Sequence, residues 1–555
     1  AGEGDKSIAQ PRVARHEVEP LVRKMQRRNG KMEVNMEREF LYDRDHVIVD
    51  TDKGKVRGYR YDGISIFKGI PYAHARRFHA PEAVKPWEGV MDATSYGYVC
   101  PLLEMGKPGG ELMVPHRYWV MDEDCQNLNI WTPECDGGKR PVLVWLHGGG
   151  FEAGSAIEQI AYEGESMCRE GQAVVVSINH RLNILGYFDL SDFGEEYANS
   201  GNAGGDDIVA ALRWIHENIA AFGGDPENVT IFGQSGGGAK VTVLLQTPAA
   251  DGLYAKGINM SGTIDQLFTE SDETGQELAM EIMAELGIDG DIRELEEVPY
   301  SALAEAYKTV KPGLAAAGKY VGCIPRANGF YAGSPDRIGF RKETAHIPML
   351  IGSTYGEFTA FAAPEVRKEQ LTENQGAAMV TEALGLSAAQ ELLPLYKSAY
   401  PHRNPVDLLT LDFIFRLPGQ RYIRNRSALN KCTYSYLFDL DMSINGRTVP
   451  AHCADIPFVF HNTQLVPSTQ IPGVTEKLEK QIFDTVMAFA RTGSPENPAI
   501  PHWPASAPET ENAMIFNENT YLGVNHDREL VPVFAKYMGP IFMRRMAEVM
   551  GKVQH

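Results

Sequence analysis

Strand-sized runs of β-branched and apolar residues alternate with helical patterns in the middle of the chain. Three such runs are VLVWLH (142–147), AVVVSIN (173–179) and NVTIF (228–232). Between the last two, apolar residues recur at three- and four-residue spacing and so share one face of a helix: Ile208, Leu212, Ile215, Ile219 and Phe222. Strand, crossover helix and strand form the βαβ unit of a parallel sheet. The sequence therefore predicts an α/β fold with a large, mostly parallel central sheet and helices on both faces.

The rest of the pattern predicts the domain organisation. Further strands are expected at 256–261, 347–353 and 433–440. The stretches near 266–345 and 363–430 carry helical patterns without a clear sheet signal, so we expect helical insertions there that cap the sheet and shape a pocket. No internal repeat, low-complexity tract or linker separates domains. We therefore expect a single domain over 41–555, preceded by an extension over 1–40.

The acidic balance of the chain disfavours several classes of partner. A formal charge of −20 repels the phosphates of nucleic acids and anionic membrane surfaces. No apolar run reaches the roughly 20 residues that cross a bilayer, so no membrane span is expected. The seven cysteines show no CxxC spacing, and neither a metal nor another cofactor is expected. A cytoplasmic location is favoured over a secreted one, while a monomer and a homodimer both stay open.

The stretch GQSGGGAK (233–240) places a serine between glycines directly after the run NVTIF. In a G-x-S-x-G turn between a strand and a helix, a strained backbone presents the serine hydroxyl to substrate, which predicts Ser235 as a nucleophile. Gly233 and Gly237 avoid side-chain clashes in such a turn. The alternative is an ordinary strand-to-helix turn in which Ser235 only caps the helix.

A second glycine-rich stretch, HGGGF (147–151), follows the run VLVWLH. A serine that attacks a carbonyl needs donors for the oxyanion that forms, and glycines let backbone N–H groups come close to it. The predicted oxyanion hole consists of the N–H groups of Gly149, Gly150 and Gly236. The alternative is a flexible glycine turn without a role.

A nucleophilic serine also needs a base, and in this architecture the acid and then the histidine follow it along the chain. Six histidines lie beyond position 357, and their spacing alone selects none of them. His452, in the segment VPAHCADIPFVF after a predicted strand, is favoured over His461.

Taken together, these segments resemble the type B carboxylesterases of the α/β-hydrolase superfamily, which include cholinesterases, some fungal lipases and bacterial p-nitrobenzyl esterases. The resemblance runs from about 47 to 535. The segments that carry it are FKGIPYA (67–73), EDCQNLNIWTP (123–133), HGGGF, INHRLNILGYF (178–188), the stretch 201–237 and HCADIPFVF.

The resemblance implies roles for further residues. In IGSTYGEFTAF, Glu357 occupies the position of the family acid, with Asp455 as the alternative. His452 matches the family histidine, which favours it over His461. Ser261, in NMSGT, matches a serine that steadies the acid, although it can also simply end a strand.

The resemblance also implies structural pairs. Two ion pairs are expected to brace the loops around the site: Arg181 with Asp207 and Arg77 with Glu123. Cys100 and Cys125 match a family disulfide that closes a loop over the mouth of the site. In a reducing compartment both would stay thiols.

Several positions depart from the family pattern. The usual turn is GESAGG, and here Gln234 and Gly236 replace the glutamate and the alanine. Gly356 and Phe358 stand where the acid segment usually has aspartate and glycine. Gln234 keeps polar contacts near the histidine without the negative charge that favours cationic substrates, and Trp119 does not match the choline-binding tryptophan. A choline ester is therefore not expected.

These observations predict a serine carboxylesterase that hydrolyses soluble short-chain or aromatic carboxylic esters through an acyl-enzyme. One alternative is a lipase for longer acyl chains, although the loop over 100–125 lacks a large apolar lid. The other is a non-catalytic binding or adhesion protein of the same family.

Overall fold

The structure is a computed structural model whose chain divides into two compact units, Ala1–Phe40 and Leu41–His555. It describes residues 26–28, 31–33, 46–103, 116–263, 274–359, 366–444 and 447–553. In the first unit, strand β1 (Gln26–Arg28) pairs antiparallel with β2 (Lys31–Glu33). The remainder of the expected extension over 1–40 lies outside the described residues.

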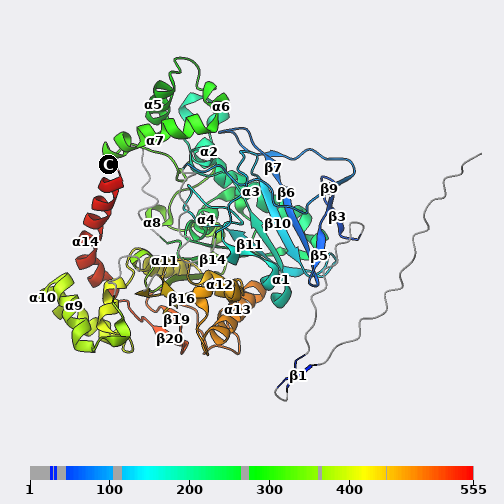
Figure 1. The fold of residues 1–555 in the computed structure, drawn as a ribbon. Helices are drawn as coiled ribbons and strands as arrows, with labels where there is room; N and C mark the ends of the chain where they lie inside the picture. The colour runs from blue at the N-terminus through cyan, green and yellow to red at the C-terminus, as the bar shows by residue number, and fades with distance from the viewer. Residues whose placement is uncertain are drawn as a thin grey trace, which may run out of the picture. The chain divides into compact units, whose positions relative to one another are not determined.

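An eleven-stranded sheet forms the centre of the second unit (Figure 1). In spatial order its strands are β20 (Tyr521–Val524), β19 (Asn512–Phe516), β16 (Thr433–Phe438), β15 (Met349–Thr354), β14 (Lys256–Met260), β13 (Gly224–Gln234), β11 (Arg140–Leu146), β12 (Val174–Ile178), β10 (Asn127–Thr132), β6 (Ile64–Pro71) and β5 (Tyr59–Tyr61). The strands from β19 to β12 run parallel, and the strands at both edges join antiparallel. All six strands expected from the sequence belong to the parallel part.

Helices cover both faces of this sheet because its strands are apolar on both sides. In β11, Val142 and Val144 pack into the cluster that includes Leu212 of α3 (Ala203–Asn218). The alternate residues Leu143 and Trp145 belong to the opposite cluster, with α13 (Thr475–Thr492). This alternation follows from the two-residue period of a strand. The helix and its apolar stripe expected over 206–222 are confirmed, with Ile219 and Phe222 on a 3-10 turn after α3.

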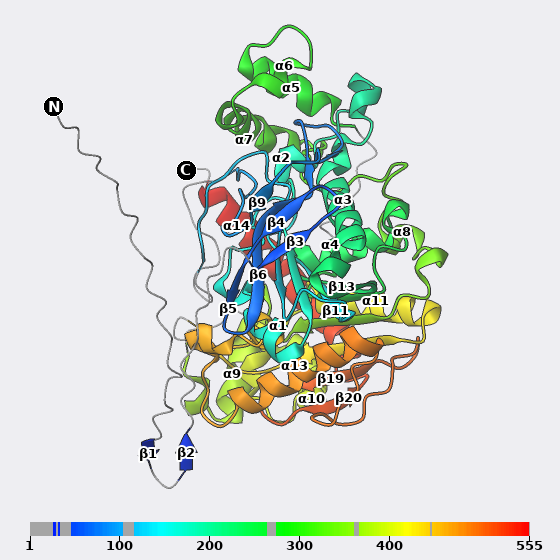
Figure 2. The same cartoon turned by 90° about the vertical axis from the view of Figure 1, so that its right-hand side faces the viewer.

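Two groups of helices follow β14 and β15. The first contains α5 (Gln276–Leu286), α6 (Glu294–Glu297), α7 (Tyr300–Ala316) and α8 (Pro335–Ile338), and the second contains α9 (Glu373–Leu384), α10 (Leu386–Ala399) and α11 (Arg416–Leu429). Both views place α5, α6 and α7 away from α9 and α10 (Figure 1, Figure 2). Two ranges lie outside the described residues, 264–273 and 360–365. They overlap the beginnings of the insertions expected over 266–345 and 363–430.

The other strands and α-helices complete the described chain. They are β3 (Ile48–Asp50), β4 (Lys55–Arg57), β7 (Ala73–His74), β8 (Glu82–Ala83), β9 (Val90–Asp92), β17 (Ser443–Ile444), β18 (Arg447–Thr448), α1 (Glu165–Gly171), α2 (Asn183–Gly186), α4 (Gly236–Leu245), α12 (Ile456–Val459) and α14 (Leu530–Val553). Among the described residues, no helix combines the length and the apolar character needed to cross a membrane.

The structural pairs implied by the family resemblance are present around the sheet. Arg181 Nη2 lies 2.7 Å from Asp207 Oδ1 with both side chains buried, and Arg77 Nε donates to Glu123 Oε2 at 2.9 Å. The pair of Arg181 and Asp207 is fully buried, so removing one partner would leave the other charge unpaired and away from water.

The two cysteines at the expected loop are buried and are free thiols in the structure. A hydrogen bond to Cys100, together with burial, raises the pKa of Cys125 well above its ordinary value. The two thiols are therefore neighbours, and the structure does not contain the disulfide that the resemblance implies. Residues 104–115 of the loop between them lie outside the described residues.

Candidate active site

Ser235 occupies the turn between the end of β13 and the start of α4. Its φ of 58° and ψ of −125° lie outside the regions that a residue with a side chain normally adopts. Such a conformation costs about 1–3 kcal/mol and persists where the surroundings enforce it. Ser235 stands at the N-cap position of α4, but its side chain makes no capping hydrogen bond. Helix capping therefore does not account for this serine.

Glu357 is fully buried in the loop after β15, with a positive φ of 41°. Its Oε1 accepts hydrogen bonds of 2.6 Å from the Ser261 hydroxyl and of 2.6 Å from the Thr354 N–H. Its Oε2 bonds to Nδ1 of His452. The carboxylate is thus fixed on one side by Ser261, as the resemblance implied, and presents its other oxygen to the imidazole.

His452 lies in the segment after β16 and is 5% exposed. The side-chain nitrogen of Gln234 lies 3.4 Å from Nδ1 and 3.3 Å from Nε2, so the amide faces the imidazole ring. The rings of Phe358 and Phe415 lie 4.3 and 5.0 Å from the imidazole, centroid to centroid. Among the described residues, no hydrogen bond joins Ser235 to His452, and such bonds are often long in enzymes without substrate.

The structure places the two alternative residues elsewhere. Asp455 Oδ2 accepts a hydrogen bond of 2.7 Å from the Tyr436 hydroxyl and does not take the place of Glu357 at the imidazole. Nδ1 of His461 lies 3.4 Å from Glu479 Oε1, a carboxylate of α13. The acid and the imidazole that the structure brings together are therefore Glu357 and His452.

The three glycines of the predicted oxyanion hole come together beside Ser235. A Cβ atom added to Gly236 would lie 2.2 Å from the backbone oxygen of Gly150, and one added to Gly149 would lie 2.3 Å from the oxygen of Ala153. The loop therefore packs against the start of α4 at a distance that only glycine permits. Within the described part of the chain, the N–H groups of Gly149, Gly150 and Gly236 donate no hydrogen bond. These donors are available to a ligand.

Two further buried carboxyl groups adjoin Glu357. Burial, and then the negative charge of Glu357, raise the pKa of Asp412 to about 8, although it accepts hydrogen bonds from three backbone N–H groups. Burial raises the pKa of Asp455 to about 6. Asp412 therefore holds its proton more tightly than an exposed aspartate does, next to the carboxylate of Glu357.

Sequence reasoning missed Asp412, Phe415 and Lys240. Asp412 and Phe415 belong to one turn before α11, and nothing in their local sequence indicates that this turn approaches His452. Lys240 did carry a signal, because it is a single charged residue in the otherwise apolar stretch GGGAKVTVLL of α4. Such a residue is buried only with a specific partner.

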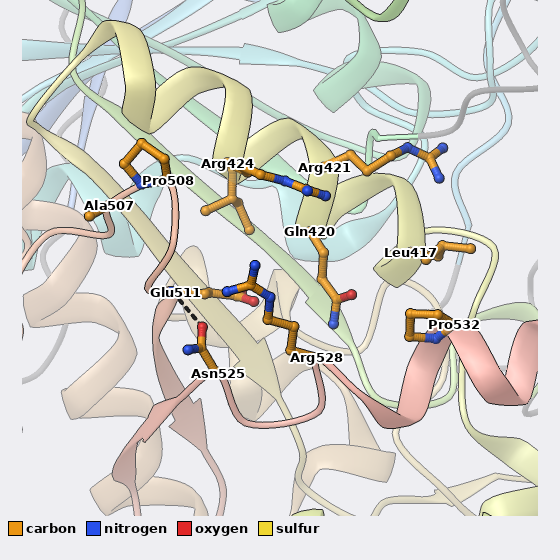
Figure 3. A pocket seen from close by; sticks show the side chains of 11 residues that line it. Leu417, Gln420, Arg421, Arg424, Ala507, Pro508, Glu511, Asn525, Arg528 and Pro532 are labelled. Atoms are coloured by element: carbon orange, nitrogen blue, oxygen red, sulfur yellow. Dashed lines mark hydrogen bonds between the residues drawn. The ribbon is translucent and has the colours of Figure 1, made fainter.

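A cavity of about 230 Å³ lies beside α11, lined by Leu417, Gln420, Arg421, Ile423, Arg424, Ala507, Pro508, Glu511, Asn525, Arg528 and Pro532 (Figure 3). None of these is a predicted site residue. No group of three or more His, Cys, Asp or Glu side chains that could hold a metal ion occurs in the described ranges. The groups suited to acyl transfer are those around Ser235.

Comparisons with known proteins show the family of the chain. The model of the carboxylesterase family matches residues 45–530. A para-nitrobenzyl esterase of Bacillus subtilis is 32% identical over 487 residues, which cover 85% of this chain and 95% of that protein. The structure of a p-nitrobenzyl esterase is 30% identical, covers 88% of this chain and 99% of its own, and has a TM-score of 0.71.

A second solved structure is that of an esterase from the anaerobe Clostridium hathewayi that can hydrolyse aliphatic aromatic polyesters. It is 48% identical, covers 90% of this chain and 100% of its own, and has a TM-score of 0.87. The resemblance inferred from the motifs and the predicted fold class are both confirmed. The chain belongs to the carboxylesterase family and is a carboxylic ester hydrolase with the α/β-hydrolase fold.

Proposed function

We propose that the protein is a serine carboxylesterase for soluble short-chain or aromatic carboxylic esters. Ser235 attacks the ester carbonyl while His452 takes its proton, and Glu357 orients the imidazole and stabilises its cation. The N–H groups of Gly149, Gly150 and Gly236 receive the oxyanion. His452 then protonates the departing alcohol, and a water molecule deprotonated by His452 hydrolyses the acyl-enzyme and restores Ser235.

The observation that carries this proposal is the placement of the four side chains on one sheet edge. Ser235, Ser261 and Glu357 follow the adjacent parallel strands β13, β14 and β15, and His452 follows β16. The carboxyl ends of parallel strands meet at the same edge, where α/β proteins bind their ligands. Hydrogen bonds join Ser261 to Glu357 and Glu357 to His452. They support the roles of Glu357 as the acid and of His452 as the base.

The surroundings of His452 support the substrate class. Phe358 is 41% exposed and presents an aromatic face next to the imidazole, which suits an aryl group of an ester. Gln234 provides a neutral amide where a carboxylate would attract cations. The p-nitrobenzyl esterases and the polyester-hydrolysing esterase to which the chain is similar act on esters with aromatic groups, in line with this choice.

The test is the variant Ser235→Ala, assayed with p-nitrophenyl acetate and p-nitrophenyl butyrate. We expect activity to fall by about 10⁴-fold or more, because the attacking oxygen is lost, with an unchanged circular dichroism spectrum. Ser301→Ala, at an exposed position of α7, is the matched control and should keep full activity. Undiminished turnover in Ser235→Ala would refute the assignment.

Two further measurements separate the alternatives. A fluorophosphonate probe should label the wild type on Ser235, whereas a non-catalytic binding protein would form no adduct. A series of p-nitrophenyl esters should show the highest kcat/KM for short acyl chains or for aryl acids. Peak activity beyond about ten carbons would instead identify a lipase, since long chains need an apolar channel.

A further inference from the structure

Lys240 is buried in α4, five residues after Ser235. The residue is 1% exposed, and within the described part of the chain no carboxylate forms an ion pair with it. A buried lysine without a paired acid costs free energy, because its ammonium loses the solvation that water provides. Strongly perturbed charged groups cluster at functional sites, where the charge has a role.

The ammonium of Lys240 is directed at the HGGGF loop. Its Nζ donates a hydrogen bond of 2.9 Å to the backbone oxygen of His147 and lies 5.7 Å from the centroid of the Phe151 ring. These are the first and last residues of the loop, with Gly149 and Gly150 between them. One side chain on the helix that follows Ser235 therefore contacts both ends of the loop that presents the proposed oxyanion donors.

The histidine that Lys240 contacts is itself fixed in place. Its ring stacks on His180, with centroids 5.0 Å and planes 20° apart, and its Nδ1 donates to the Gly148 oxygen at 2.9 Å. Burial, and then the positive charge of Lys240, lower the pKa of His147 and of His180 well below the ordinary value. Both rings are thus neutral, and the positive charge of this cluster resides on Lys240.

We infer that Lys240 is a positioning residue for ester hydrolysis: its ammonium holds the HGGGF loop against Gly236 and adds positive charge behind the oxyanion hole. The inference rests on the proposed function, in which the loop donors receive the ester oxygen. When Ser235 attacks, that oxygen gains negative charge, and a preorganised cation stabilises it more in the transition state than in the ground state. Loss of Lys240 therefore lowers kcat more than it changes KM.

The charge of Lys240 titrates in the working range of pH. Burial lowers the pKa of Lys240 to about 7, and the carboxylate of Glu158 opposes that shift. The titratable groups that face it from the neighbouring segments are His147, His180 and Glu158. The cation is present below its pKa and absent above it, so its contribution to kcat declines as the pH rises through about 7.

The effect on stability separates the proposed role of Lys240 from a purely structural one, because loss of a residue kept for stability lowers the melting temperature. Because the pKa of Lys240 is lower in the folded state than its ordinary value of 10.5, the unfolded state binds more protons, and burial of Lys240 costs stability at every pH below 10.5. Replacing it with methionine, of similar length and without charge, removes this cost. Lys240→Met should therefore unfold at a higher temperature while turning over more slowly.

The experiment compares Lys240→Met and Lys240→Gln with the wild type. The matched control is Lys256→Met, which removes another buried lysine, one that donates to Asn228 rather than to the loop. For each protein, kcat and KM for p-nitrophenyl acetate are measured across pH, and kcat is corrected for the fraction of Ser235 that a fluorophosphonate labels. Inhibition by an aryl trifluoromethyl ketone reports on the oxyanion hole, since it forms a tetrahedral adduct with an oxyanion.

We expect Lys240→Met to lower kcat by about 10- to 100-fold and to weaken binding of the trifluoromethyl ketone by a similar factor. The decline of kcat as the pH rises through about 7 should also disappear. Lys240→Gln retains a hydrogen-bond donor without a charge, so it should lose less kcat and also lack the decline. Lys256→Met should behave as the wild type. Unchanged kcat and pH dependence in Lys240→Met, or a loss of kcat that merely follows a lower melting temperature, would overturn the inference. A wild type that is not labelled on Ser235 would overturn the proposed function instead.

Discussion

At the scale of single residues, the charges around the site follow a consistent arrangement. Gln234 offers a neutral amide to the imidazole of His452, and burial raises the pKa of Asp412, which adjoins Glu357. Positive charge is carried by Lys240, which contacts the loop of the proposed oxyanion hole. In the proposed reaction, both arrangements suit a neutral ester whose oxygen becomes negative during attack.

The variant Gln234→Glu tests the first part of this arrangement. A carboxylate about 3.3 Å from the imidazole stabilises the imidazolium, so the acidic limb of the pH–rate profile should move upward by about one unit. The control Gln276→Glu makes the same change at an exposed position at the start of α5. A profile that coincides with the wild type would show that position 234 does not act through charge.

The site residues that could be predicted from the sequence are those with a short local signature. Ser235 stands out through its glycines, and the loop donors through HGGGF, whereas Glu357 and His452 needed the family resemblance to be chosen over Asp455 and His461. Asp412 and Phe415 had no signature, because the approach of Asp412 to Glu357 and of Phe415 to His452 depends on how the segment before α11 packs. Tertiary contacts of this kind have no local pattern.

At the scale of elements, the site depends on the fit between one loop and one helix start. The HGGGF loop rests on Gly236 so closely that a Cβ atom there would meet the oxygen, Cα and nitrogen of Gly150 at 2.2 to 2.5 Å. The family turn usually has alanine at this position. In this chain the loop occupies space that an alanine methyl group would fill.

We therefore expect Gly236→Ala to displace the loop, although alanine is the usual residue of the family. Moving one oxyanion donor away should lower kcat by about 10- to 100-fold, with a smaller change in KM. Steady-state kinetics with p-nitrophenyl butyrate measures the effect. Gly313→Ala in α7, where an added Cβ meets nothing within 4 Å, should leave kcat unchanged. Equal kinetics for the two variants would contradict the close packing of loop and helix.

At the scale of the whole molecule, a buried ionic cluster joins α11 to the far edge of the sheet. Arg416 Nη1 lies 2.7 Å from Glu511 Oε1, and its Nη2 lies 2.7 Å from Asp527 Oδ1. Burial alone would raise the pKa of Asp527, but the charge of Arg416 outweighs it and holds the pKa at about 2. The cluster connects the segment that carries Phe415 to β19 and to the loop before α14.

The variant Arg416→Met should lower the free energy of unfolding by about 3–5 kcal/mol, because it leaves two buried carboxylates unpaired. Denaturant midpoints at neutral pH measure this. The control Arg528→Met breaks the exposed pair with Glu509 and should cost less than about 1 kcal/mol. Because the folded-state pKa of Asp527 is lowered, its contribution is present above its ordinary pKa of 3.8 and disappears as the pH falls toward 2. The difference between wild type and Arg416→Met should shrink over that range.

Most of the parallel part of the sheet could be predicted from the sequence, while β19 and the edges could not. Strands such as β12 and β14 are buried on both faces, and β12 in particular reads as a continuous apolar run. The edge strand β5, with pattern YRY, is short and half-buried, and β20 is partly exposed. Their pairing depends on the neighbouring strand more than on their own composition.

The position of Phe358 has a consequence for protein engineering. This ring lies next in sequence to Glu357, on a loop whose backbone already has a positive φ at the acid. In the proposed function Phe358 contacts the ester and Glu357 orients His452, so one short loop carries both roles. We therefore expect substitutions at Phe358 to change substrate range and turnover together, and variant libraries there should be screened for both properties.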